Sequence, residues 1–97
     1  MVKLAFFARF QAKPGKEEAV AKFLEKALDM VNKEPTTINW YALKLSPNTF
    51  GVFDTFNTED GRQRHLTGPV GQALMAAAPE LFTSPPSIEP VELLGLK

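Results

Sequence analysis

Apolar segments with two different periods alternate along the 97 residues, and their order restricts the chain to a few α+β folds. Two of the strand-like segments are joined by Ser46-Pro47-Asn48, a turn short enough for a hairpin. The order is strand, helix, strand, strand, helical segment, strand, as in a ferredoxin-like βαββαβ sandwich with an antiparallel sheet. The predicted strands are residues 2–11, 38–45, 50–56 and 88–96; the predicted helices are residues 16–33, a short helix ending near residue 66, and residues 69–77.

Residues 50–66, FGVFDTFNTEDGRQRHL, join a strand to the short helix that carries the only histidine, His65. Asn57 and Thr58 are favourable N-cap residues, and the acidic residues that follow suit the positive end of a helix. Gly68-Pro69 then ends this helix and can begin the next one. We therefore expect an imidazole close to the end of a buried strand.

The composition excludes several classes of function. Lys plus Arg equals Asp plus Glu, so the formal net charge is zero, which argues against nucleic-acid binding because phosphates require clustered positive charge. With no cysteine and one histidine, a single chain cannot form disulfides, thiolate metal sites or histidine-rich metal sites. The sequence has no apolar run long enough to span a bilayer and no signal-peptide pattern. We expect one domain over residues 1–97, located in the cytoplasm.

Large apolar side chains occur as adjacent pairs in two predicted strands, Phe6-Phe7 and Trp40-Tyr41. Neighbouring residues of a strand point to opposite faces, so both faces of the sheet carry apolar groups. The helices can cover only one face, and monomers avoid a large exposed apolar patch. We therefore expect a homodimer in which two sheets pack against each other.

Polar residues within apolar strands are candidates for chemistry. Asp54 and Arg9 could form a structural ion pair, or together they could hold a polar group of a substrate. Histidine titrates near neutral pH, so His65 could accept a phenolic proton, or it could be a buried helix residue bonded to a carbonyl or carboxylate. Trp40 could line a pocket and donate through its indole N–H, or it could only pack. Tyr41 points the opposite way, so one of the two is expected to face the pocket and the other the partner subunit.

Two stretches resemble the antibiotic-biosynthesis monooxygenase family of dimeric α+β barrels, which includes quinol monooxygenases. They are ARFQAKPGKEEAVAKFLE, residues 8–25, and EPTTINWYALKLSPNTFGVFDTFNTEDGRQRHLTGPV, residues 34–70. The most family-like features are the ARF-x-AKPGKEE opening, the Glu34-Pro35 helix stop, and a strand followed by Glu59 and His65. The resemblance covers nearly the whole chain.

The resemblance implies a pocket between the helices and the sheet, where O2 oxidises a small aromatic phenol or quinol without flavin, haem or metal. It suggests His65 as the base, with Trp40 and Asp54 as further catalytic candidates. A deprotonated phenol can pass an electron to dioxygen, so the protein need supply only a base, a donor for the oxyanion and a dry pocket. The candidate substrate-contacting residues are Phe7, Arg9, Tyr41, Phe53, Phe56 and Leu74.

The haem-degrading branch of the family differs from this chain at two places. In that branch a tryptophan aligns with Phe56, and an axial histidine lies in the helix after Pro69. Here that helix reads PVGQALMAAA and contains no histidine, so haem is not expected. Two alternatives to a monooxygenase stay open: a non-catalytic small-molecule-binding or structural dimer, and an isomerase or decarboxylase that uses His65 as a proton shuttle.

Overall fold

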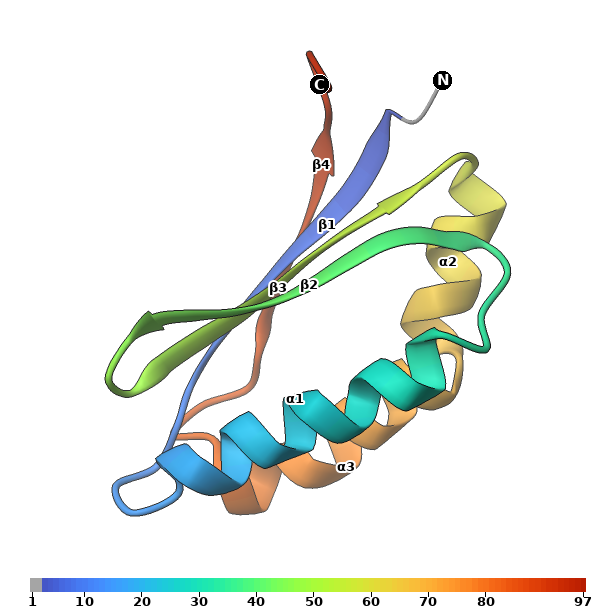
Figure 1. Ribbon diagram of the computed structural model, residues 1–97. Coiled ribbons are helices and arrows are strands. Elements are labelled where there is room, and N and C mark those ends of the chain that lie inside the picture. Colours follow the sequence, from blue (N-terminus) through green and yellow to red (C-terminus); the bar gives the residue numbers. More distant parts are fainter. Residues whose placement is uncertain (1–2) are drawn as a thin grey trace.

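Four strands and three helices make up the part of the chain that the computed structural model describes, residues 3–97 (Figure 1). The elements in order are β1 (Leu4–Gln11), α1 (Glu17–Val31), β2 (Thr37–Ser46), β3 (Thr49–Phe56), α2 (Glu59–Thr67), α3 (Pro69–Leu81) and β4 (Ser87–Glu92).

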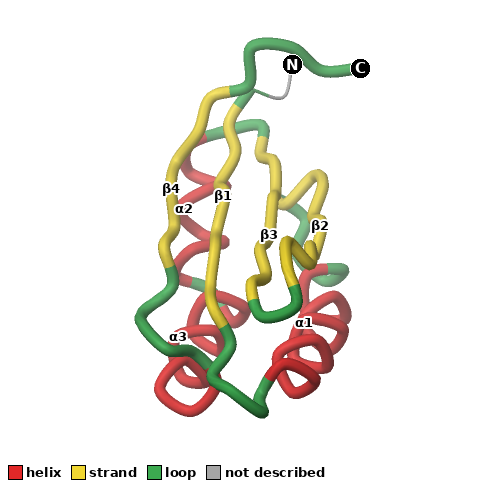
Figure 2. Tube along the Cα trace, turned by 90° about the vertical axis from the view of Figure 1, so that its left-hand side faces the viewer, coloured by secondary structure: helices red, strands yellow, loops and turns green. Residues whose placement is uncertain are grey.

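The strands form one sheet in the order β2-β3-β1-β4, and every neighbouring pair is antiparallel. β1 and β2 are therefore parallel with β3 between them, which is the split βαβ unit of a ferredoxin-like fold. Figures 1 and 2 show all three helices on the same side of the sheet. The predicted α+β fold class is confirmed.

The core lies between this sheet and the helices. On β1, Phe6, Ala8 and Phe10 are buried, and they alternate with Phe7 and Arg9, which are more exposed. On α1 the residues that face the sheet recur at three- and four-residue spacing, as predicted: Val20, Leu24, Ala27 and Val31.

Two element boundaries differ from the predictions by more than two residues. α3 continues through Pro79 to Leu81, because a proline in the last turn removes only one backbone donor, and the Phe82 N–H still bonds the Ala78 carbonyl. The last strand ends at Glu92 instead of residue 96. The first strand begins at Leu4, and the predicted start at Val2 lies outside the described residues.

The face of the sheet opposite the helices is apolar along one row. Tyr41 pairs with Phe53, and Phe53 pairs with Phe7, so three aromatic side chains from three strands lie side by side. Tyr41 is 53% exposed, and nothing within residues 3–97 packs over it as a second layer. The prediction that large apolar groups point to both faces is confirmed.

Candidate active site

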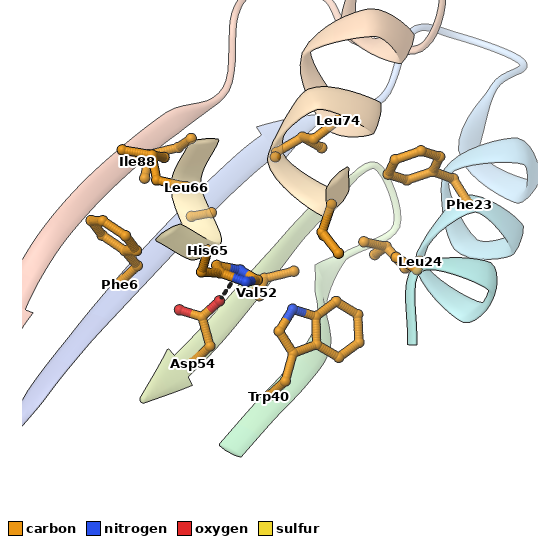
Figure 3. Close-up of a pocket in the computed structure, with 14 residues that line it drawn as sticks. Phe6, Phe23, Leu24, Trp40, Val52, Asp54, His65, Leu66, Leu74 and Ile88 are labelled. Carbon is orange, nitrogen blue, oxygen red and sulfur yellow. Dashed lines mark ion pairs between the residues drawn. The ribbon is translucent and has the colours of Figure 1, made fainter. Parts of the chain in front are cut away.

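An apolar cavity of about 50 Å³ lies between the sheet and the helices, and one side of it carries ionisable groups (Figure 3). Strand register builds its floor, because Phe6 pairs with Asp54 and Asp54 pairs with Trp40, which places all three on the helix side of the sheet. The complete lining is Phe6, Ala8, Phe23, Leu24, Ala27, Trp40, Val52, Asp54, His65, Leu66, Val70, Gly71, Leu74 and Ile88.

His65 reaches the cavity from the last turn of α2. This helix begins where predicted: the Thr58 hydroxyl accepts a hydrogen bond from the Gly61 N–H at 3.0 Å. Among its nine residues only Gly61 and His65 are buried, so the cap and its end charges support the helix more than an apolar stripe does. The Phe56 ring lies against the imidazole, with ring centroids 5.3 Å apart.

Both nitrogens of the His65 ring are bonded to carboxylates. Nε2 lies 2.9 Å from Asp54 Oδ2 on β3, and Nδ1 lies 2.6 Å from Glu34 Oε1 in the connection between α1 and β2. The Thr37 hydroxyl also donates to Glu34 Oε1, at 2.8 Å. A carboxylate only accepts hydrogen bonds, so two carboxylate partners favour the doubly protonated imidazolium. We call Asp54, His65 and Glu34 the buried triad.

The electrostatics of the triad follow from its composition. Burial alone would lower the pKa of His65, but the hydrogen bonds and negative charges of Asp54 and Glu34 outweigh it, and the pKa is raised above 6.5. With one imidazolium and two carboxylates, the triad carries a net charge of minus one beside an apolar cavity.

Two polar groups beside the cavity could bond a ligand. Asp54 Oδ1 is buried and has no hydrogen-bond partner among residues 3–97. The indole nitrogen of Trp40 points toward His65 (Figure 3), so its N–H is a donor on the same side of the cavity. A free acceptor and a donor in one apolar site suit a ligand with hydroxyl groups, since a hydroxyl donates one hydrogen bond and accepts others.

The structure brings together all three predicted catalytic residues, because His65, Trp40 and Asp54 line the cavity. Leu74 lines it as well, whereas Phe56 is completely buried behind the imidazole. The other four predicted substrate contacts, Phe7, Arg9, Tyr41 and Phe53, do not line the cavity, because they alternate with the cavity-facing residues of their strands. Tyr41, on the edge strand β2, instead lines a separate groove between α1 and β2.

The Arg9–Asp54 ion pair considered from the sequence does not form. Arg9 pairs in register with Gly51 on the exposed face, while Asp54 faces the helices and bonds His65. The Arg9 guanidinium instead lies over the Phe7 ring, 5.9 Å from its centroid. Of Trp40 and Tyr41, it is Trp40 that faces the cavity.

Glu34 and Thr37 are the members of this site that sequence reasoning missed. The Glu34-Pro35 pair was interpreted only as the end of a helix, and no local pattern marks Glu34 as a buried carboxylate. Glu59, which the resemblance paired with His65, does not line the cavity; its carboxylate bonds the Arg62 guanidinium at 2.6 Å.

Neither a metal-binding cluster nor a membrane-spanning helix occurs in the described part of the chain. Among residues 3–97, no group of three or more His, Asp or Glu side chains has the arrangement to hold a metal ion. None of the helices in that range is long and apolar enough to cross a membrane.

Solved structures share this fold, although no protein-family model and no curated protein matches the chain. The NE2512 protein of unknown function from Nitrosomonas europaea is 57% identical, has a TM-score of 0.97, and the match covers 100% of this chain and 94% of that one. Rv0793 from Mycobacterium tuberculosis is 18% identical over 97% of both chains, with a TM-score of 0.84. A structure named "Putative antibiotic biosynthesis monooxygenase from Nitrosomonas europaea" is 14% identical, with a TM-score of 0.83 over 95% of this chain and 90% of that one.

Proposed function

Because the chain belongs to the same family as NE2512 and has the fold of antibiotic biosynthesis monooxygenases, we propose that it oxidises a small aromatic alcohol with O2 in the cavity beside the buried triad. The proposal includes no flavin, haem or metal. Its substrate class is a phenol, naphthol or quinol that presents a hydroxyl group to Asp54.

The observation that carries this proposal is the unpaired oxygen of Asp54. A carboxylate oxygen buried without a partner costs free energy, so it calls for an explanation in terms of a ligand or a chemical role. Asp54 Oδ1 belongs to a residue that lines the cavity, while Oδ2 is held by the His65 Nε2–H at 2.9 Å. A substrate hydroxyl would satisfy Oδ1, and the Trp40 N–H is a further donor for a polar group of the substrate.

The geometry favours a division of roles in which Asp54 accepts the substrate proton. In the imidazolium form, His65 has no free lone pair, because both nitrogens donate to carboxylates. His65 would then act as a positioning residue: it fixes the Asp54 carboxylate, and its positive charge offsets the negative charge that forms on the substrate oxygen. In the alternative division, His65 loses a proton first and is itself the base.

The overall reaction balances without a further reductant. A phenol with a free ring position reacts with O2 to give a quinone and water: one oxygen atom enters the ring and the other leaves as water. The four electrons that O2 accepts all come from the substrate. The phenolate formed at Asp54 is the electron donor. The apolar walls exclude water, which would otherwise solvate the phenolate and make it less reactive toward O2.

We also propose that the protein acts as a homodimer. The row Tyr41, Phe53 and Phe7 leaves an apolar strip on the face opposite the helices, and a second sheet packed against it would bury these rings. This arrangement leaves the cavity on the outer side of each sheet, where the helices cover it.

A second candidate is a non-catalytic small-molecule-binding protein with the same fold. Two observations favour it: the triad is closed on itself at both ring nitrogens, and a cavity of about 50 Å³ is smaller than the roughly 150 Å³ that accommodates benzene in a protein core. In that case the triad would connect α2, β3 and the α1–β2 connection, and no substrate would turn over.

Oxygen uptake with metal-free protein and a panel of hydroquinones and dihydroxynaphthalenes tests the proposal. The matched variants are Asp54→Asn and Glu34→Gln, because each neutralises one carboxylate bonded to His65 but only Asp54 lines the cavity. We expect Asp54→Asn to lower turnover by about a hundredfold to ten-thousandfold and Glu34→Gln to have a much smaller effect. Equal losses would mean that the triad acts only structurally, and no uptake by the wild type with any substrate would favour the non-catalytic alternative.

A further inference from the structure

A second, larger hollow adjoins the cavity. It is a groove of about 480 Å³ between α1 and the edge strand β2. Its volume lies within the range of roughly 300–1,000 Å³ that is usual for small-molecule sites, whereas the inner cavity of about 50 Å³ lies far below it. A ligand with an aromatic ring therefore cannot be held by the inner cavity alone without movement of its walls.

Two side chains line both the cavity and the groove: Leu24 of α1 and Trp40 of β2. They stand next to each other at one side of the cavity in Figure 3, and Trp40 is only partly buried. Displacement of these two side chains, of which Leu24 is 5% exposed and belongs to the core, would join the two spaces.

The chemistry of the groove indicates what it would bind. Apart from Glu25, Lys44 and the hydroxyl group of Tyr41, its side chains are alkyl or aromatic, and they include Leu28, Leu43 and Phe50. The two charges are of opposite sign and cancel, and the Lys44 ammonium lies 6.0 Å from the centroid of the Phe50 ring. An uncharged apolar chain suits such a surface, because the groove has no excess of positive or negative charge that would attract an ionic group.

We propose that the groove binds the apolar substituent of an aromatic alcohol whose hydroxylated ring enters the cavity, with Trp40 and Leu24 as the movable wall between ring and substituent. This inference rests on the proposed function for the position of the hydroxyl group. It narrows the substrate class to phenols or quinols that carry an alkyl or isoprenoid-like side chain, as opposed to small unsubstituted ones.

Binding of a series of 4-alkylphenols, from phenol to octylphenol, tests the inference through tryptophan fluorescence. Trp40 is the only tryptophan, so a change in emission reports on the proposed wall itself. We expect the dissociation constant to fall by about fourfold for each methylene that the groove buries, until the groove is filled. An unchanged emission on saturation with octylphenol would overturn the role of Trp40.

The matched variants are Leu28→Glu and Met75→Glu. Leu28 lines the groove and is 43% exposed, and Met75 is 53% exposed on α3 and lines neither the groove nor the cavity, so both should fold with a glutamate in place. In Leu28→Glu, we expect the dissociation constant to fall by only roughly twofold or less for each methylene, while phenol itself binds as in the wild type. In Met75→Glu, we expect the dissociation constants of the whole series to equal those of the wild type. A series that is the same in Leu28→Glu as in the wild type would overturn the proposed site.

These outcomes separate the inference from the proposed function. If alkylphenols bind with the expected dependence on Leu28 but no quinol consumes oxygen, the groove is a binding site and the monooxygenase proposal fails. If oxygen is consumed but the Leu28→Glu series equals the wild-type series, the monooxygenase proposal stands and the groove is not its binding site.

Discussion

Asp54 meets His65 through only one of its two carboxylate oxygens. Oδ2 lies 2.9 Å from Nε2, whereas Oδ1 is buried and unpaired within the described part of the chain. The opposite side of the imidazole is closed by Glu34, whose Oε1 lies 2.6 Å from Nδ1. Glu34 Oε2 is likewise buried and unpaired in that range, but Glu34 does not line the cavity, so Asp54 is the member of the triad whose free oxygen belongs to a cavity residue.

The first prediction concerns the titration of His65. Its pKa is raised above 6.5 by Asp54 and Glu34, so the stability gained from the imidazolium is fully present below about pH 6.5. As the pH rises through the folded-state pKa, this contribution is lost, and the free energy of unfolding should decrease over that interval. Urea unfolding at a series of pH values measures the decrease, and the NMR titration of the single histidine gives the folded-state pKa.

Glu34→Gln is the control for this prediction. It keeps a hydrogen-bond acceptor beside Nδ1 but removes one of the two negative charges, so the His65 pKa should move down relative to the wild type. A wild-type midpoint at or below 6.5 would show that burial outweighs the carboxylates.

The second prediction concerns the close approach of α2 and α3. A Cβ atom at Gly71 would lie 2.0 Å from the Leu66 carbonyl oxygen, so Gly71→Ala must push the two helices apart. We expect a loss of about 1–3 kcal/mol in unfolding free energy, measured by urea denaturation. Gly95→Ala is the matched control, because nothing lies within 4 Å of a Cβ there, and it should be close to neutral. Equal stability of the two variants would contradict the helix contact.

Much of the fold could be predicted because it depends on local patterns. The apolar stripe of α1, the cap at Thr58 and the alternation of strand residues each act over a few neighbouring residues. Pro79 is an exception: it was predicted to end the helix, but near a helix end a proline costs little free energy, and α3 continues through it.

The candidate site could be predicted only in part, because it depends on register and on contacts between distant residues. His65 and Asp54 were identified as unusual residues, but the sequence does not reveal that 31 positions before His65 a glutamate closes the other side of the ring. The error for Arg9 has a similar origin. Both residues of the supposed ion pair interrupt apolar strands, but the register between β1 and β3 places them on opposite faces.

The third prediction concerns the homodimer. Tyr41→Asp places a charge in the aromatic row of the uncovered face, where a sheet-to-sheet interface would bury it without a partner. The residue is 53% exposed in the single chain, so the variant should stay folded but become monomeric. Light scattering should give twice the chain mass of 10.7 kDa for the wild type and the single-chain mass for the variant.

Met75→Asp controls for the general effect of a new surface charge, because Met75 lies on α3, on the helix side of the sheet. It should remain dimeric. A wild-type protein that is monomeric at micromolar concentration would contradict the proposed dimer, and a dimeric Tyr41→Asp variant would place the interface elsewhere.

The fourth prediction concerns the dependence of the rate on pH, which distinguishes the two divisions of roles in the site. If Asp54 accepts the substrate proton and the His65 imidazolium holds Asp54 in place, kcat/KM should fall as the pH rises through the raised pKa of His65. If neutral His65 is the base, the rate should instead rise through the same pKa. The substrate should be a phenol whose own pKa lies well above the range tested, so that its ionisation does not contribute.

Glu34→Gln should shift the midpoint of the profile to lower pH, because it removes a charge that raises the His65 pKa. A profile whose midpoint does not move in this variant would mean that the titrating group is not His65.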